Sequence, residues 1–197
     1  MIRKEVLEKA LSYKEYILLL EELLKLGRTT GPVQNEDKLN AAKINLQRMR
    51  RLDKTIVLSQ DLLGATREIK GRYLIIILTE GWCGDASQNI PIFAALERQA
   101  PQLEVRFLLR DEHPEIMDQY LTKGTRSIPI AICVEKESMT EKFIWGPRPE
   151  ILQKQVEELL KKKVPKEEKG LFVQTWYNND KTQTAQRELL QLVGTLN

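Results

Sequence analysis

The chain has 197 residues, of which 42% are hydrophobic and 30% are charged, as in globular proteins that bury a sizeable core. Its 31 basic and 28 acidic residues leave a net charge of +3, which argues against a nucleic-acid or membrane partner. The two cysteines, Cys83 and Cys133, lie far apart, so a disulfide framework is excluded and a reducing, cytoplasmic compartment is expected. The first residues lack the apolar core of a signal peptide, and no apolar stretch is long enough to span a bilayer.

The N-terminal residues, 1–54, are expected to form a helical extension. Apolar residues recur with helical spacing from Tyr13 to Leu26, and Ser12 with Glu15 forms the pattern of a capping box at the start of this helix. Gly27 is expected to end it. A second amphipathic helix is expected over residues 37–52.

From Thr55 onward, helical and strand patterns alternate. Helices are expected over residues 59–70, from Cys83 to about Ala100 with Pro91 inside, and over 114–121 and 150–163; strands are expected over 73–78, 103–109, 128–134 and 142–145. This order predicts an α/β fold, a central mixed sheet flanked by helices. Residues 55–163 would form this domain, and residues 164–197 a C-terminal helical extension packed on it.

The segment Trp82-Cys83-Gly84-Asp85-Ala86 stands between a buried strand and a helix. A cysteine in this position is expected to be partly exposed. The free N–H groups and the dipole of the helix N-terminus would lower its pKa, and the nearby carboxylates of Glu80 and Asp85 would offset part of that effect. Cys83 is therefore the candidate catalytic nucleophile.

This segment resembles the Trp-Cys-Gly-x-Cys active site of thioredoxins. Two further stretches match the family: Arg126-Ser127-Ile128-Pro129 before a strand, and Arg110-Asp111-Glu112-His113-Pro114-Glu115 before a helix. The resemblance covers residues 55–160 and implies a thioredoxin-like fold, in which Pro129 follows a cis peptide bond and faces Cys83. The helical ends resemble those of a subgroup of bacterial thioredoxin-like proteins.

Two departures from the family bear on the chemistry. Ala86 stands where thioredoxins carry the second, resolving cysteine, and Ile77 stands where they carry a buried aspartate. A single thiolate can attack a disulfide, but release of the mixed disulfide then needs an external thiol such as glutathione. The resemblance therefore implies weak or absent thioredoxin-type disulfide reduction.

Two functions remain open at this point. One is monothiol redox or thiol-exchange activity of Cys83 on a protein or peptide substrate. The alternative is a redox-inactive module that binds an extended peptide or protein partner beside the cis-proline. The residues expected to contact a substrate in either case are Trp82, Gly84, Asp85, Ala86, Ile128 and Pro129.

The remaining candidate residues indicate no cofactor. Cys133 lies in an apolar strand and is interpreted as a buried apolar residue. His113, the only histidine, is expected in a surface turn. One histidine and two cysteines do not provide a zinc site within one chain, so no metal is expected.

Overall fold

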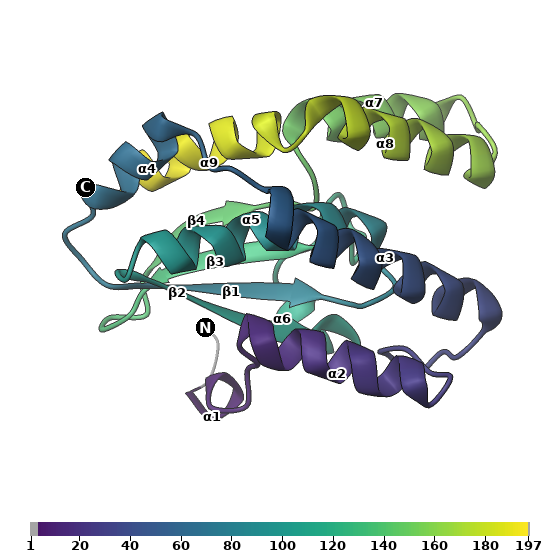
Figure 1. Cartoon of the computed structure of the whole chain (residues 1–197), viewed down its shortest axis with the longest axis horizontal. Helices are drawn as coiled ribbons and strands as arrows, with labels where there is room; N and C mark the ends of the chain where they lie inside the picture. The colour runs from purple at the N-terminus through teal and green to yellow at the C-terminus, as the bar shows by residue number, and fades with distance from the viewer. Residues whose placement is uncertain (1–3, 197) are drawn as a thin grey trace.

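The computed structural model describes residues 4–196 as a four-stranded mixed sheet with helices around it (Figure 1). The strands are β1 (Tyr73–Thr79), β2 (Leu103–Leu109), β3 (Ile130–Glu135) and β4 (Glu141–Trp145). Their order is β2-β1-β3-β4; β1 pairs with β2 in parallel, whereas β3 is antiparallel to both β1 and β4. The expected α/β class and thioredoxin-like arrangement are confirmed.

The helices precede, separate and follow the strands. They are α1 (Lys4–Leu7), α2 (Tyr13–Lys25), α3 (Glu36–Thr55), α4 (Gln60–Arg67), α5 (Gly84–Gln99), the 3-10 helix η1 (Arg110–Glu112), α6 (Pro114–Met117), α7 (Glu150–Lys161), α8 (Lys166–Asp180) and α9 (Gln183–Gly194). Within residues 4–196, no helix is long and apolar enough to cross a membrane.

The core lies on both faces of β1, whose seven residues are all buried. This explains why its sequence is a continuous apolar run rather than an alternation. On the N-terminal side, the Tyr16 ring of α2 stacks on Phe107 of β2 with centroids 5.3 Å apart. Leu11 also exchanges two backbone hydrogen bonds with Phe107, of 2.9 and 2.8 Å, so the N-terminal extension covers the β2 edge of the sheet.

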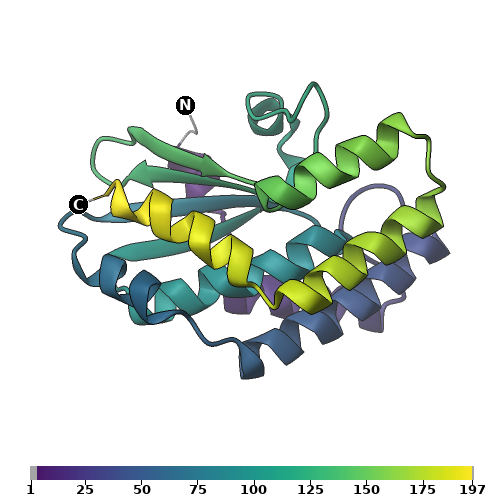
Figure 2. The ribbon, with the colours of Figure 1, turned by 90° about the horizontal axis from the view of Figure 1, so that it is seen from above.

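The C-terminal helices lie along the opposite side of the molecule from α2 (Figure 1), and Figure 2 shows α8 and α9 forming a nearly continuous arm beside α3 and α5. Leu189 and Val193 of α9 belong to the main core. Tyr177 of α8 instead packs in a small second cluster with Leu152 and Val156 of α7. Both helical ends thus pack against the central sheet and its helices.

Several expected elements have different bounds in the structure: α3 ends at Thr55 rather than at residue 52, α4 at Arg67 rather than at residue 70, and α7 at Lys161 rather than at residue 163. The helix that begins at Pro114 ends at Met117 rather than at residue 121, with Asp118 as its C-cap residue. A turn at Lys123 and Gly124, which both have positive φ, follows it. The strand expected from residue 128 begins at Ile130, since Pro129 has no N–H to contribute to the ladder.

Candidate functional site

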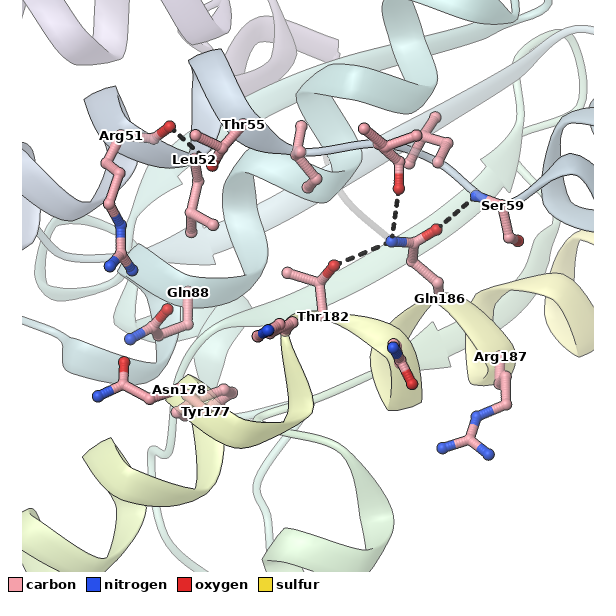
Figure 3. Close-up of a pocket in the computed structure, with 15 residues that line it drawn as sticks. Arg51, Leu52, Thr55, Ser59, Gln88, Tyr177, Asn178, Thr182, Gln186 and Arg187 are labelled. Atoms are coloured by element: carbon pink, nitrogen blue, oxygen red, sulfur yellow. Dashed lines mark hydrogen bonds between the residues drawn. The ribbon is translucent and has the colours of Figure 1, made fainter.

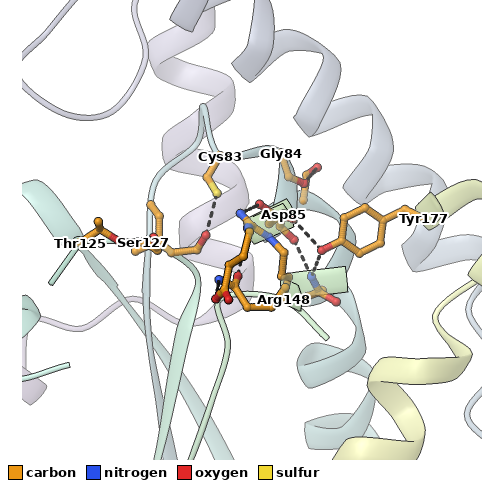
Figure 4. A network of polar contacts seen from close by, with 12 residues as sticks. Cys83, Gly84, Asp85, Thr125, Ser127, Arg148 and Tyr177 are labelled. Carbon is orange, nitrogen blue, oxygen red and sulfur yellow. Dashed lines mark hydrogen bonds and ion pairs between the residues drawn. The ribbon is translucent and has the colours of Figure 1, made fainter. Parts of the chain in front are cut away.

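Cys83 lies between β1 and α5, where it is the N-cap residue of the helix. Its side chain is 8% exposed, and its Sγ donates a hydrogen bond to the backbone carbonyl of Ile128 at 3.2 Å (Figure 4). The peptide bond between Ile128 and Pro129 is cis, and both residues are buried. The structure therefore brings the thiol and the proline segment together, although 45 positions separate Cys83 from Ile128.

The electrostatics of Cys83 differ from the sequence expectation of a partly exposed thiol with a lowered pKa. Burial, together with the smaller effect of the Asp85 carboxylate, raises the pKa of Cys83 to about 12. The backbone N–H groups of Ala86 and Asp85 and the guanidinium of Arg148 act in the opposite direction, but burial dominates. The helix N-terminus is present as predicted; the open, solvated environment is not.

Asp85 is held by side chains from two other parts of the chain. Nη2 of Arg148, in the loop after β4, lies 2.6 Å from Oδ2 of Asp85, and the Tyr177 hydroxyl of α8 donates to Oδ1 at 2.7 Å (Figure 4). Asn89 of α5 donates in turn to the Tyr177 oxygen at 3.0 Å. The side chains of Asp85 and Arg148 are only 12% and 17% exposed. The network fixes the first turn of α5 beside the thiol.

Neither Arg148 nor Tyr177 was identified as a site residue from the sequence. An arginine between two prolines, Pro147 and Pro149, gives no signal of its partner. Tyr177 lies in the segment 164–197, for which the sequence predicts only a helical extension. Their roles depend on contacts across 63 and 92 positions of the chain.

The Pro129 segment is itself packed tightly from the β4 side. Gly146 has φ +120°, and a Cβ on it would lie 2.2 Å from the Pro129 carbonyl oxygen. Glycine allows both this backbone angle and this approach. The loop that carries Arg148 is thereby held against Pro129.

Trp82, the residue before Cys83, is partly buried. Two cations lie over its ring, with Lys38 Nζ 4.2 Å and the Arg110 guanidinium carbon 4.8 Å from the centroid. Of the other expected contact residues, Ala86 is buried and Gly84 is exposed.

A buried carboxylate, Glu80, lies three residues before the cysteine. It accepts a hydrogen bond from the Asp111 N–H at 2.9 Å, and burial raises its pKa. Glu80 was considered in the sequence only as a nearby charge. In the structure, it fastens η1 to the loop that carries Trp82 and Cys83.

Cys133 lies in the middle of the sheet, paired with Ile75 of β1 and Phe143 of β4, and is fully buried. Its interpretation as a buried apolar residue is confirmed, and burial raises its pKa to about 12. Both cysteines are free. Across residues 4–196, no group of three or more His, Cys, Asp or Glu side chains is arranged to hold a metal ion.

Comparison with known proteins gives one family and two solved structures. A family model described as "Thioredoxin" matches residues 31–162. A protein of unknown function, PA1234 from Pseudomonas aeruginosa, superposes with a TM-score of 0.57 at 16% identity, covering 93% of this chain and 97% of that one. An HIV epitope-scaffold superposes with a TM-score of 0.56 at 14% identity, covering 93% and 98%. No curated protein matched the sequence.

Proposed function

Because this chain belongs to the thioredoxin family, we propose that it is a thioredoxin-fold binding protein in which Cys83 serves as an internal hydrogen-bond donor. The observation that carries this proposal is the Cys83 Sγ to Ile128 carbonyl contact of 3.2 Å, made by a thiol that is 8% exposed. A nucleophilic cysteine needs a thiolate at neutral pH and access for its substrate. The buried, protonated thiol of Cys83 provides neither in this conformation.

The environment of Cys83 also lacks the partners of a two-cysteine cycle. The position of the resolving thiol is Ala86, which is 1% exposed and has no reactive group. The other cysteine, Cys133, is paired with Ile75 within the sheet. Without a second thiol at the site, an intramolecular release of a mixed disulfide is not available.

The proposed partner is an extended peptide or protein segment that docks beside Pro129. Backbone pairing with such a segment would use the Ile128 carbonyl, which accepts a hydrogen bond from the Cys83 thiol in this structure. A peptide N–H that replaces this bond would free the sulfur. Partner binding and exposure of Cys83 are therefore proposed to be coupled.

The test is the rate of Cys83 alkylation by iodoacetamide as a function of pH. It is measured on Cys133→Ser, which keeps Cys83 as its single thiol, and on the double variant Cys83→Ser/Cys133→Ser as the control. Slow alkylation with a midpoint well above that of a free thiol, about 8.5, is the expected result. A fast reaction with a midpoint near neutrality would overturn the binding proposal in favour of thiol exchange.

Monothiol exchange is the second candidate, favoured by one observation. The N–H groups of Asp85 and Ala86 and the Arg148 guanidinium all favour the Cys83 thiolate. Once exposed, that thiolate would attack a substrate disulfide, form a mixed disulfide with one sulfur and expel the other as a thiolate. An external thiol such as glutathione would then attack the mixed disulfide, form a new disulfide with the substrate sulfur and release the Cys83 thiolate. The proposed setting is a reducing cytoplasm, in keeping with two free cysteines.

Incubation of the Cys133→Ser protein with glutathione disulfide, followed by intact-mass measurement, separates the two candidates. Thiol exchange requires one glutathione adduct that the Cys83→Ser control lacks. Binding without exchange predicts no adduct while the protein stays folded.

A further inference from the structure

A cavity of about 890 Å³ lies between the end of α3 and the junction of α8 and α9 (Figure 3). Its walls come from α3, the α3–α4 connection, Gln88 of α5, and residues 177–187. The volume falls within the range of roughly 300–1,000 Å³ that is typical of small-molecule sites. Its location is distinct from the Cys83–Ile128 contact.

The charges that line this cavity all have one sign. Arg51, Lys181 and Arg187 contribute cations, whereas none of the Asp and Glu residues in 4–196 belongs to its lining. Within that same part of the chain, none of the three cations forms an ion pair. Most cations of a folded surface have mixed-sign neighbours, so this grouping favours an anionic occupant.

Arg48, one helical turn before Arg51, extends the positive region. Its side chain is bonded to Asn45 and Gln174, both neutral amides. Burial and the neighbouring charge of Arg51 lower the pKa of Arg48. An anion near Arg51 would relieve this unneutralised pair of guanidinium groups.

A second, independent observation comes from two glutamines that line the cavity and are each 6% exposed. Gln186 is fully used: it accepts from the Ser59 N–H at 2.8 Å, and its Nε2 donates to the Val57 carbonyl at 3.1 Å. Gln88, by contrast, has an Nε2 without any hydrogen-bond partner in residues 4–196. A buried donor left unpaired is costly, so the Gln88 amide points to an acceptor that a ligand would supply.

The unpaired donor of Gln88 lies with Arg51 at one end of the cavity, whereas Arg187 lies beside Gln186 at the other end. Figure 3 shows the Gln88 amide between the Arg51 guanidinium and the side-chain amide of Asn178. At the other end, the bonded Gln186 holds the wall rigid next to the apolar residues Val57 and Leu58. The cavity therefore combines an anion-recognising end, formed by Arg51 and Gln88, with an end where the apolar residues Val57 and Leu58 lie near Gln186 and Arg187.

We propose that this cavity binds a phosphate-bearing small molecule, with the phosphate held by Arg51, Gln88 and Lys181. A guanidinium offers paired donors that match a phosphate, and the Gln88 amide supplies a further N–H. The end with Val57 and Leu58 would receive the organic part of the ligand, which makes a nucleotide-sized molecule a suitable occupant. The proposal goes beyond the partner-binding function and does not depend on the state of Cys83.

Calorimetric titration of the full chain with inorganic phosphate and with adenosine monophosphate tests this assignment. Saturable binding is expected for at least the nucleotide, with a weakening of about tenfold or more in Arg51→Gln because a charge-assisted contact is lost. Arg50→Gln is the matched control: it makes the same change at the adjacent position, where Arg50 is paired with Glu21 outside the cavity. Its affinity is expected to stay within about twofold of the unmodified protein.

Two further variants keep the test decisive if one of them fails to fold. Lys181→Asn removes the second cation but suits the left-handed backbone angle of Lys181, φ +49°. Gln88→Met removes the unpaired donor at similar volume. Weakened binding in both, with unfolding curves that remain cooperative, supports the site. Absence of saturable binding to the unmodified protein, or equal losses in Arg50→Gln and Arg51→Gln, would overturn it.

Discussion

Arg148 Nη2 lies 2.6 Å from Asp85 Oδ2, and this ion pair joins the loop after β4 to the first turn of α5. Asp85 therefore places its own negative charge at the helix N-terminus, where the dipole would otherwise favour a thiolate at Cys83. Because Arg148 neutralises that charge within the protein, the site is balanced without an ionised sulfur. The charges of Asp85 and Arg148 thus balance each other, and the buried thiol of Cys83 stays protonated and uncharged.

The first prediction concerns this ion pair. Arg148→Met should lower the free energy of unfolding by about 3 kcal/mol, because it leaves the mostly buried Asp85 carboxylate without its cation. Urea unfolding monitored by circular dichroism measures the change. Arg126→Met is the matched control, since Arg126 also binds an aspartate, Asp118, at 2.7 and 2.8 Å, but on an exposed surface. Equal losses in the two variants would contradict a special role for the Arg148 pair.

The second prediction follows from the thiol. The pKa of Cys83 rises from 9.0 to about 12 in the folded protein, so folding favours the neutral thiol. Its stabilising contribution is complete below pH 9 and is lost as the pH rises toward 12, at no more than about 1.4 kcal/mol per pH unit. The difference in unfolding free energy between the wild type and Cys83→Ala should be constant from about pH 6 to 8 and decrease above about pH 9.

Both proteins retain the buried tyrosines Tyr16 and Tyr177, whose pKa values are also raised, so these contributions cancel in the comparison. Urea titrations at successive pH values provide the measurement. A difference that stays flat up to pH 11 would show that the thiol ionises freely in the folded state, against the burial described here.

The sequence predicted correctly those structural features that depend on residues close together in the chain. The capping box of Ser12 and Glu15 is present, because both groups lie within one helical turn. The strand over residues 103–109 has the predicted bounds, since alternation reports a sheet face directly. The cysteine at the start of α5 was also predicted correctly from the strand–turn–helix pattern.

The burial of Cys83 could not be predicted from such local patterns. It depends on the Ile128 carbonyl 45 positions away, and on how closely the loop with Gly146 approaches Pro129. Neither the spacing of apolar residues nor the Trp-Cys-Gly motif contains information on these contacts. For the same reason, the cavity at the α8–α9 junction had no counterpart among the sequence predictions.

The third prediction tests how α3 holds the loop before Cys83. The Asn45 side chain is 1% exposed; its Nδ2 donates to the Gly81 carbonyl at 3.0 Å, and its Oδ1 accepts from Arg48 at 3.0 Å. Asn45→Leu should lower the unfolding free energy by about 2 kcal/mol, because it leaves a buried carbonyl unpaired. Asn40→Ala, at an exposed position of the same helix, should change it by no more than about 0.5 kcal/mol. Thermal and urea unfolding of both variants measure these changes. Comparable losses of unfolding free energy in the two variants would refute the role of Asn45 in holding the loop before Cys83.

The last prediction concerns the approach of Gly146 to Pro129. A Cβ at position 146 would lie 2.2 Å from a backbone carbonyl oxygen, which cannot rotate away as a side chain can, and φ is +120°. Gly146→Ala should therefore cost about 2–4 kcal/mol of unfolding free energy. It should also move the Pro129 segment away from Cys83, which makes alkylation of the thiol faster than in the unmodified protein.

Gly170→Ala provides the matched control for this change. Gly170 lies inside α8, where an added Cβ meets no atom within 4 Å. The substitution should stabilise the protein by up to about 1 kcal/mol through helix propensity, without altering the alkylation rate. The same chemical change is thus expected to lower the unfolding free energy at position 146 and to raise it at position 170. An unaffected thiol in a destabilised Gly146→Ala protein would mean that the contact supports the fold but does not enclose Cys83.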